Sequence, residues 1–233
     1  MSLECTGLVS GYREGVNVLS DVSFTLDSGA IGIIGRNGAG KSCLAQTLSG
    51  ALKTRDGAIT LDGRDITRLG SRKRVRAGVS LVPEGRLVFG QLTVRENLMV
   101  SAYAAGKSSS TIGQYEERFP ILGKKRNHAA ASMSGGEQQL LAIARALIQR
   151  PRVIVLDEPS LGLSPIAIDG LTENLRSIVE GSDVLVVLME QNGELLSGLC
   201  EQVLLMEQGA VVRRLDLRNE TDQKALEASY LGL

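Results

Sequence analysis

Aromatic residues are scarce in this sequence, and neither sign of charge is in excess. Tryptophan is absent, aromatic residues make up 3% of the chain, and the formal net charge is +0. Few rings are therefore available to stack bases, and no overall field attracts the chain to nucleic acid or to an acidic membrane. We expect no nucleic-acid partner. The basic runs SRKRVRAG and GKKR are interpreted as solvated faces, with lipid headgroups as an alternative contact.

Cysteine, histidine and long apolar runs are also lacking. The three cysteines, Cys5, Cys43 and Cys200, show no CxxC spacing, and the one histidine, His128, lies in a polar stretch. This favours free thiols over a disulfide framework or a zinc site, and a solvated position for the histidine. Apolar runs such as VLVVLM fall far short of the ~20 residues that span a bilayer, and no signal peptide opens the chain. We therefore expect a cytoplasmic protein.

The first third of the chain has the pattern of short strands. The 233 residues suffice for one sizeable domain or for a core with an inserted subdomain. Segments 18–29, 30–35 and 57–63 are apolar runs bounded by glycine and aspartate, which predicts strands around one helix. This opening is interpreted as a β subdomain joined to a larger core.

The remainder alternates between helical and strand patterns. From 92–106 to 140–150 the apolar period is helical, and the soft segment 106–113 is predicted to be an exposed loop. Continuous apolar runs then follow at 152–159 and 183–191, with a helix-like segment between them, which is typical of a parallel sheet covered on both faces. The predicted fold class is α/β: residues 1–88 plus 152–233 form the core with its β subdomain, and 89–151 form an inserted helical subdomain.

The segment GRNGAGKS, from Gly35 to Ser42, fits the phosphate-binding pattern G-x-x-x-x-G-K-[ST] directly after an apolar run and before a helix. Its glycines allow backbone N–H groups to surround phosphates, Lys41 reaches the terminal phosphates, and the Ser42 hydroxyl ligates Mg²⁺. The alternative is an ordinary glycine turn. The predicted nucleotide-binding residues here are Gly35, Asn37, Gly38, Ala39, Gly40, Lys41, Ser42 and Cys43.

A pair of carboxylates, Asp157 and Glu158, ends the apolar run RVIVLDEP. Open α/β sheets bind ligands at this end of their strands, and a buried acidic pair is costly without a cation or a function. We expect Asp157 to face Mg²⁺ through water and Glu158 to be the base that orients and deprotonates the attacking water. A plain helix N-terminus is the alternative.

The stretch SMSGGEQQ offers a second set of backbone N–H groups at a helix start, where anions bind. Ser134 and Glu137 also have the spacing of a capping box, and an apolar stripe follows them. From these residues alone, capping is favoured over anion binding.

The order of these motifs resembles that of the ATP-binding cassette (ABC) ATPases over nearly the whole chain. The resemblance implies ATP and Mg²⁺ as ligands, a P-loop core, and two cassettes that meet head to tail. Ser134, Gly135, Gly136 and Glu137 would then be the signature loop, which contacts the ATP held by the partner cassette. The same resemblance assigns adenine stacking to Tyr12, nucleotide and metal contact to Glu84 in the Q-loop, a catalytic contact to Gln191 at the switch-histidine position, and the D-loop to SLGLSP.

Three positions depart from the family pattern. Cys43 stands where a second hydroxyl is common, Ser164 replaces the D-loop aspartate, and Gln191 replaces the histidine. The segments LVPEGRLVF, LDEPSLGLSP, MEQN and the terminal YLGL are nevertheless similar to the second ATPase of branched-chain amino-acid importers. That resemblance implies these partners: a second ABC ATPase subunit, as a heterodimer or homodimer, two transmembrane permease subunits, and indirectly a solute-binding protein. It also implies a peripheral position on the inner face of the cell membrane.

Other functions remain open at this point. One alternative is a soluble ABC ATPase that acts on DNA or the ribosome, although the coiled-coil insertion, zinc hook or second cassette of such proteins is missing here. An importer of urea or amides and a lipid exporter are the alternatives within transport. Substrate does not touch an ABC ATPase, so these residues do not identify the transported solute.

Overall fold

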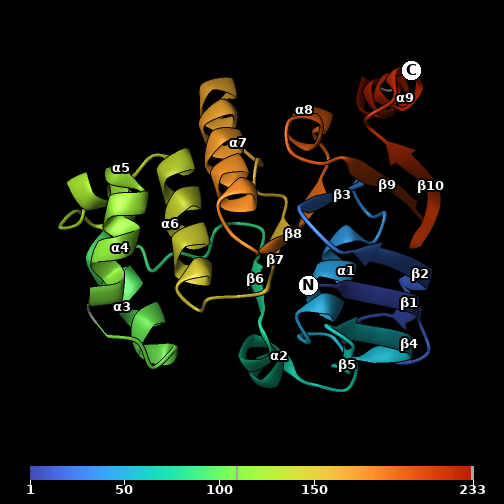
Figure 1. Ribbon diagram of the computed structural model, residues 1–233, viewed down its shortest axis with the longest axis horizontal. Coiled ribbons are helices and arrows are strands. Elements are labelled where there is room, and N and C mark those ends of the chain that lie inside the picture. The colour runs from blue at the N-terminus through green and yellow to red at the C-terminus, as the bar shows by residue number, and fades with distance from the viewer. Residues whose placement is uncertain (109, 232–233) are drawn as a thin grey trace.

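The chain forms two β-sheets with one helix between them in the computed structural model, which describes residues 1–108 and 110–231 (Figure 1). The first sheet has four strands in the order β2-β1-β4-β5 and is antiparallel. Its strands are β1 (Leu3–Ser10), β2 (Leu19–Leu26), β4 (Thr54–Leu61) and β5 (Arg64–Asp65). Two of these strands, β2 and β4, were predicted, whereas the terminal strand β1 was not.

The second sheet has six strands in the order β10-β9-β3-β8-β7-β6. All neighbours are parallel except β9 and β10, which pair antiparallel. Every residue of the central strands β3, β7 and β8 is buried, which explains their uninterrupted apolar runs. The strands are β3 (Ala30–Ile34), β6 (Val79–Val82), β7 (Val153–Asp157), β8 (Leu185–Glu190), β9 (Gln202–Glu207) and β10 (Ala210–Asp216).

Two apolar clusters cover the faces of the six-stranded sheet. Helix α1 (Lys41–Leu48) lies between the two sheets, and its Leu44 and Leu48 pack with residues of both. The opposite face is covered by α6 (Gly135–Leu147), α7 (Pro165–Glu180) and α8 (Gly193–Ser197), as Figure 1 shows. The predicted α/β fold class with a P-loop core is confirmed.

Between β6 and β7 the described residues form helices and no strand. Thr93 starts α3 with a capping box, in which its hydroxyl accepts from the Glu96 N–H and Glu96 accepts from the Thr93 N–H. The elements here are α3 (Val94–Ala104), α4 (Ser110–Arg118), α5 (Pro120–Lys124), the 3₁₀ helix η1 (Ala130–Ser132) and α6. They form a lobe at the left of Figure 1, away from the antiparallel sheet.

The prediction of an exposed loop at 106–113 is wrong for the second half of this segment. Helix α4 begins at Ser110, and Ile112 is only 1% exposed. The reason is the spacing of Ile112, Tyr115 and Phe119, which places three apolar side chains on one helical face. The Tyr115 hydroxyl also donates to the Leu147 carbonyl at 2.6 Å, which anchors α4 to α6. Ser109 of this segment lies outside the described residues, as do Gly232 and Leu233 of the terminal YLGL.

The basic run SRKRVRAG is only partly the solvated face that we expected. It forms α2 (Ser71–Ala77), in which Arg72 and Arg76 are exposed. Arg74, by contrast, is 1% exposed and donates to the carbonyls of Leu48 at 2.6 Å and Thr67 at 3.0 Å. The guanidinium thereby satisfies a free carbonyl at the end of α1, that of Leu48, and links it to the loop at Thr67. The last element of the described residues is α9 (Glu220–Leu231).

Candidate functional site

The loop between β3 and α1 has a backbone that requires glycine. Gly38 has φ 83° and Gly40, the N-cap of α1, has φ 107°, a region that is costly for other residues. A Cβ on Gly35 would lie 2.4 Å from the Met206 carbonyl oxygen. Because Gly40 has no side chain, the first N–H groups of α1 are left for a ligand at the positive end of the helix dipole.

A pocket of about 360 Å³ opens at this loop and brings together residues from distant parts of the sequence. Glu84 and Glu158 line it beside the loop, and Tyr12 forms part of its rim with 55% of its surface exposed. Gly35, the first residue of the loop, does not line the pocket. Of the predicted site residues, the pocket is lined by Tyr12, Asn37, Gly38, Ala39, Gly40, Lys41, Ser42, Cys43, Glu84 and Glu158.

Lys41 is the buried cation of this pocket, at 4% exposure. Its ammonium donates to the carbonyls of Gly35 at 2.7 Å and Arg36 at 3.4 Å, and it lies 3.0 Å from Glu158 Oε1. Phosphate oxygens would replace the neutral carbonyl partners with charged ones and compete with Glu158, because charge-assisted bonds to phosphate are short and strong. The lysine therefore stands between the phosphate loop and the candidate base.

Ser42 and Asp157 meet at the floor of the site, where the hydroxyl donates to Asp157 Oδ1 at 3.2 Å. Burial, together with the charges of Glu158 and Glu84, raises the pKa of Asp157 to about 6 against the lowering effects of the Ser42 hydrogen bond and the Lys41 charge. A hydroxyl beside crowded carboxylates is a donor set that suits Mg²⁺. Within residues 1–108 and 110–231, no three His, Cys, Asp or Glu side chains form a group that could hold a metal ion.

Glu158 has an unusual backbone, with φ 47°. Its N–H donates to the Met189 carbonyl at 2.9 Å, and its carbonyl accepts from Leu161 N–H at 3.2 Å. A non-glycine residue in the left-handed region persists only where its surroundings fix it, and such residues gather at functional sites. The turn after β7 is therefore held so that the Glu158 carboxylate faces Lys41.

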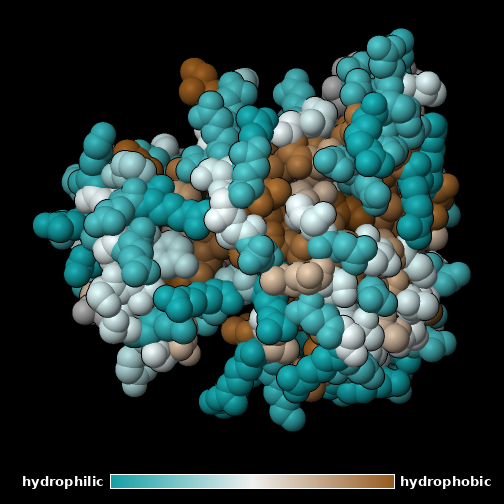
Figure 2. Space-filling view, in the orientation of Figure 1, coloured by the Kyte–Doolittle hydropathy of each residue, from teal (hydrophilic) through white to brown (hydrophobic). Residues whose placement is uncertain are grey.

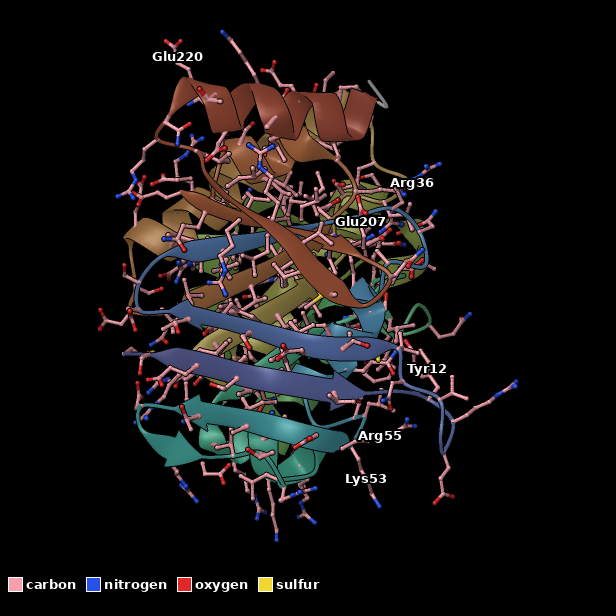
Figure 3. All side chains as sticks on the ribbon, turned by 90° about the vertical axis from the view of Figure 1, so that its right-hand side faces the viewer. Tyr12, Arg36, Lys53, Arg55, Glu207 and Glu220 are labelled. Carbon is pink, nitrogen blue, oxygen red and sulfur yellow. The ribbon has the colours of Figure 1, made fainter. Side chains whose placement is uncertain are left out.

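Tyr12 is presented by the loop 11–17, which Arg55 of β4 holds in place. The Arg55 guanidinium donates to the Val16 carbonyl and the Asn17 side chain, both at 2.7 Å, to the Gly11 carbonyl at 3.0 Å, and to the Arg13 carbonyl. Figure 3 places Tyr12 and Arg55 at the same edge of the molecule as Arg36 of the phosphate loop. Sequence reasoning missed Arg55, because nothing in the sequence around it points to a loop some 40 residues away.

The signature loop lies outside this pocket. Ser134 and Glu137 form the expected capping box: Ser134 Oγ accepts from the Glu137 N–H at 3.4 Å, and Glu137 Oε2 accepts from the Ser134 N–H at 2.8 Å. Lys125 Nζ also lies 2.7 Å from that carboxylate oxygen. The Glu137 carboxylate is therefore engaged within its own chain. Gly135 and Gly136 open α6 beside it.

Gln191 and Ser164 follow strand and loop ends near the site without lining the pocket. Gln191 is exposed, and its N–H donates to Glu190 Oε2 at 3.2 Å. The Ser164 hydroxyl accepts from Ala167 N–H at 3.4 Å and caps α7. The arrangement thus brings the P-loop, the carboxylate pair, Glu84 and Tyr12 together, and leaves the signature loop and Gln191 apart.

The glycine loop between β3 and α1, Lys41 and the carboxylate pair Asp157 and Glu158 together define a nucleotide-binding protein of the P-loop class. Residues 19–161 match the family described as ABC transporter. The chain belongs to this family, and the predicted resemblance is confirmed. Among the described residues, no helix has both the length and the apolar character needed to cross a membrane.

Individual relatives cover nearly the whole chain. The chain is 40% identical to the high-affinity branched-chain amino acid transport ATP-binding protein BraG of Pseudomonas aeruginosa, over 88% of each chain. It is 32% identical to a probable branched-chain amino acid transport ATP-binding protein LivF of Archaeoglobus fulgidus, over 99% of each. The crystal structure of a nucleotide-free ATP-binding cassette from an ABC transporter superposes with a TM-score of 0.86 at 22% identity, covering 98% of this chain and 96% of that one.

Proposed function

We propose that this chain is the ATP-hydrolysing subunit of an ABC importer and that it powers uptake of branched-chain amino acids or a related small solute. The observation that carries this function is the pocket in which Lys41, Ser42 and Glu158 converge at the phosphate loop, with Asp157 bound to the Ser42 hydroxyl. The names of the BraG and LivF relatives support the transport role and its substrate class.

Each residue of the site has a separate task in this function. The loop N–H groups and Lys41 bind the phosphates of ATP, and Tyr12 stacks on adenine. Ser42, Asp157 and Glu84 would hold Mg²⁺, which supplies positive charge at the phosphate oxygens. Glu158 orients the attacking water and takes its proton. For this task Glu158 must exchange its contact with Lys41 for one with water, so phosphate binding at Lys41 releases the base.

The signature loop serves a second cassette in this proposal. Ser134, Gly135 and Gly136 stand at the start of a helix of 13 residues and do not line their own chain's pocket. A helix start with backbone N–H groups binds anions, so a partner cassette, identical or different, would bring its ATP to this loop. Gln191, which follows β8 beside the P-loop strand β3, would approach the ATP in this chain's own pocket when the cassettes close.

The two parts of the chain would carry these two nucleotide contacts separately. Residues 1–88 and 152–233 carry the pocket, and 89–151 carry the signature loop at the start of α6. Movement of the second part relative to the first would couple ATP binding to contact between cassettes.

A groove of about 990 Å³ would be the binding site for a permease subunit. It runs between α2 and β6 on one side and α3 and α6 on the other, and Figure 2 shows this face hollowed between α2 and the lobe of α3. The described lining holds no acidic side chain. It contains these cations: Arg72, Arg76, Arg86, Lys107 and Arg145.

Two features suggest that a segment of another chain occupies this groove. Ser80 is 4% exposed, lines the groove, and its hydroxyl has no partner in the described residues. The groove also includes residues 83, 86 and 87 of the loop that carries Glu84 into the ATP pocket. An acidic permease segment bound here would sense the state of that pocket, and it would place this chain on the inner face of the membrane.

Transport assays test this function. A tagged chain is purified with the membrane subunits that bind it, and the complex is placed in vesicles with internal ATP. We expect uptake of radiolabelled leucine, isoleucine or valine that stops in a Lys41→Ala complex. Arg72→Glu with Arg76→Glu should reduce recovery of the membrane subunits while ATP binding persists. An ATPase that copurifies with no membrane subunit contradicts the proposal.

A further inference from the structure

Glu190, the last residue of β8, is an acidic side chain buried to 2% exposure at the end of an apolar strand. Its two oxygens are shared between two segments. Oε1 accepts from Ser160 N–H at 2.9 Å, and Oε2 accepts from Ser160 Oγ–H at 2.9 Å and from Gln191 N–H at 3.2 Å. One carboxylate thus joins the turn after Glu158 to the backbone of Gln191.

The contact with Ser160 falls where the backbone needs support. The left-handed φ of Glu158 is fixed on one side by its own N–H, which donates to the Met189 carbonyl at 2.9 Å. On the other side, Ser160 is tied to Glu190. Both supports come from consecutive residues at the end of β8. This pair of contacts over-determines the turn, which is the condition for a strained residue to persist.

A carboxylate at position 190 suits these hydrogen-bond donors better than a neutral side chain would. An ionised carboxylate only accepts hydrogen bonds. The groups facing Glu190 are all donors: the Ser160 N–H and hydroxyl and the backbone N–H groups of Gln191 and Asn192. Among the described residues, Glu190 forms no ion pair. Burial raises its pKa, while the bonds from Ser160, Gln191 and Asn192 oppose that change. A buried charge without a cation is costly, so its hydrogen bonds are what stabilise it here.

The geometry points to Glu190 as a positioning residue that sets Glu158 and Gln191 in one frame for water attack on ATP. This role rests on the proposed ATPase function. Glu190 is not among the residues that line the pocket, and it acts through the backbone on either side of it. Its loss should therefore lower the rate of hydrolysis and leave ATP binding, which depends on the P-loop, unchanged.

Glu190→Gln is the sharpest test because it preserves shape. One oxygen becomes an NH₂ group, which the rotatable Ser160 hydroxyl accommodates but the Gln191 N–H does not. In the complex purified with its membrane subunits, we expect kcat to fall about tenfold or more, with the KM for ATP within about twofold of wild type. Glu194→Gln, the same change at an exposed residue of α8, is the matched control and should leave both constants unchanged.

A double variant separates positioning from general weakening of the fold. Because Glu190 acts partly through Gln191, the loss of kcat in Glu190→Gln combined with Gln191→Ala should be smaller than the product of the two single losses. Multiplied effects, or a kcat for Glu190→Gln within about twofold of wild type, overturn the inference. Thermal unfolding checks that each variant is folded. If Glu190→Gln does not fold, Ser160→Ala replaces it, with a smaller loss of kcat expected and an unchanged kcat overturning the role.

Measurements on the wild-type complex distinguish the proposed ATPase function from the proposed role of Glu190. A wild-type complex that binds but never hydrolyses ATP contradicts the proposed function itself. An active wild type with an equally active Glu190→Gln variant contradicts only the role of Glu190.

Discussion

Lys41 Nζ lies 3.0 Å from Glu158 Oε1, so the lysine of the phosphate loop and the candidate base form an ion pair within one pocket. The side chains are 3% and 11% exposed, and solvent screens such a pair poorly. Phosphates that bind Lys41 must compete with Glu158 for it. Nucleotide binding and activation of the base are therefore two consequences of one exchange of partners.

Glu158→Gln should separate these consequences. We expect hydrolysis to fall ~10²-fold or more, because a positioned general base contributes 10² to 10⁴. ATP binding should be at least as tight as in wild type, since Lys41 loses a charged competitor. Steady-state hydrolysis and fluorescent-nucleotide binding measure the two effects. Near-normal turnover would show that another group is the base, and Lys41→Ala, which should lose binding itself, is the contrasting variant.

Arg55→Ala should weaken ATP binding without slowing hydrolysis at saturating ATP. The change removes the side chain that holds loop 11–17, and with it the fixed position of Tyr12. Stacking on an aromatic ring is worth ~1 to 3 kcal/mol, so affinity should fall by about 5- to 150-fold at most. Titration with a nucleotide measures this effect.

Two controls accompany the Arg55 variant. Arg64→Ala removes an exposed arginine from the neighbouring strand β5 and should leave affinity unchanged. Tyr12→Ala should match Arg55→Ala, and the double variant should bind no more weakly than either. If Arg55→Ala binds ATP as wild type does, the loop is held by other contacts.

Asp157 should make the metal-free protein less stable as pH rises from about 4 to 6. Burial raises its pKa from 3.8 to about 6, so in this window the folded state binds more protons than the unfolded state, and the free energy of unfolding falls with pH. The total effect is about 3 kcal/mol. Asp157→Asn should remove this part of the slope and be more stable above pH 6. Denaturant unfolding in EDTA at several pH values tests this; parallel curves for the two proteins contradict it.

The sequence predicted those parts of the site that depend on neighbouring residues. The phosphate loop and the pair Asp157 and Glu158 each lie within a few positions at the end of an apolar run, and the parallel sheet brings both to one edge. Tyr12 and Glu84 were assigned from the ABC resemblance, and both line the pocket. Local spacing also predicted the capping box at Ser134, which the structure has.

Contacts between distant segments could not be predicted in this way. Arg55 binds a loop some 40 positions earlier, and Glu190 binds Ser160 across 30 positions. Each looks like an ordinary charged residue in its own strand. Arg74 likewise sits within a basic run, and only the approach of α1 buries it. The segment 106–113 was misjudged because its small polar residues hide the stripe that begins at Ile112.

Ser134→Arg tests whether the signature loop faces a second nucleotide. The Ser134 side chain accepts from Glu137 N–H at 3.4 Å, while Glu137 is also held by Lys125, so the helix start has support that survives the substitution. The pocket at Lys41 does not include Ser134. We therefore expect the variant to fold and to bind ATP as wild type does, while its bulky cation blocks ATP-driven association with the partner cassette.

Ser134→Ala distinguishes this effect from loss of the cap. It removes the capping hydroxyl at a cost of ~1 kcal/mol of stability but adds no bulk, so ATP-driven association should be reduced far less than by Ser134→Arg. Thermal unfolding, nucleotide binding by the full chain, and light scattering of the mixed cassettes with ATP measure the three properties. If Ser134→Arg is folded, binds ATP and still associates with its partner, the loop is a helix cap alone, and the two-cassette site must be sought elsewhere on the surface.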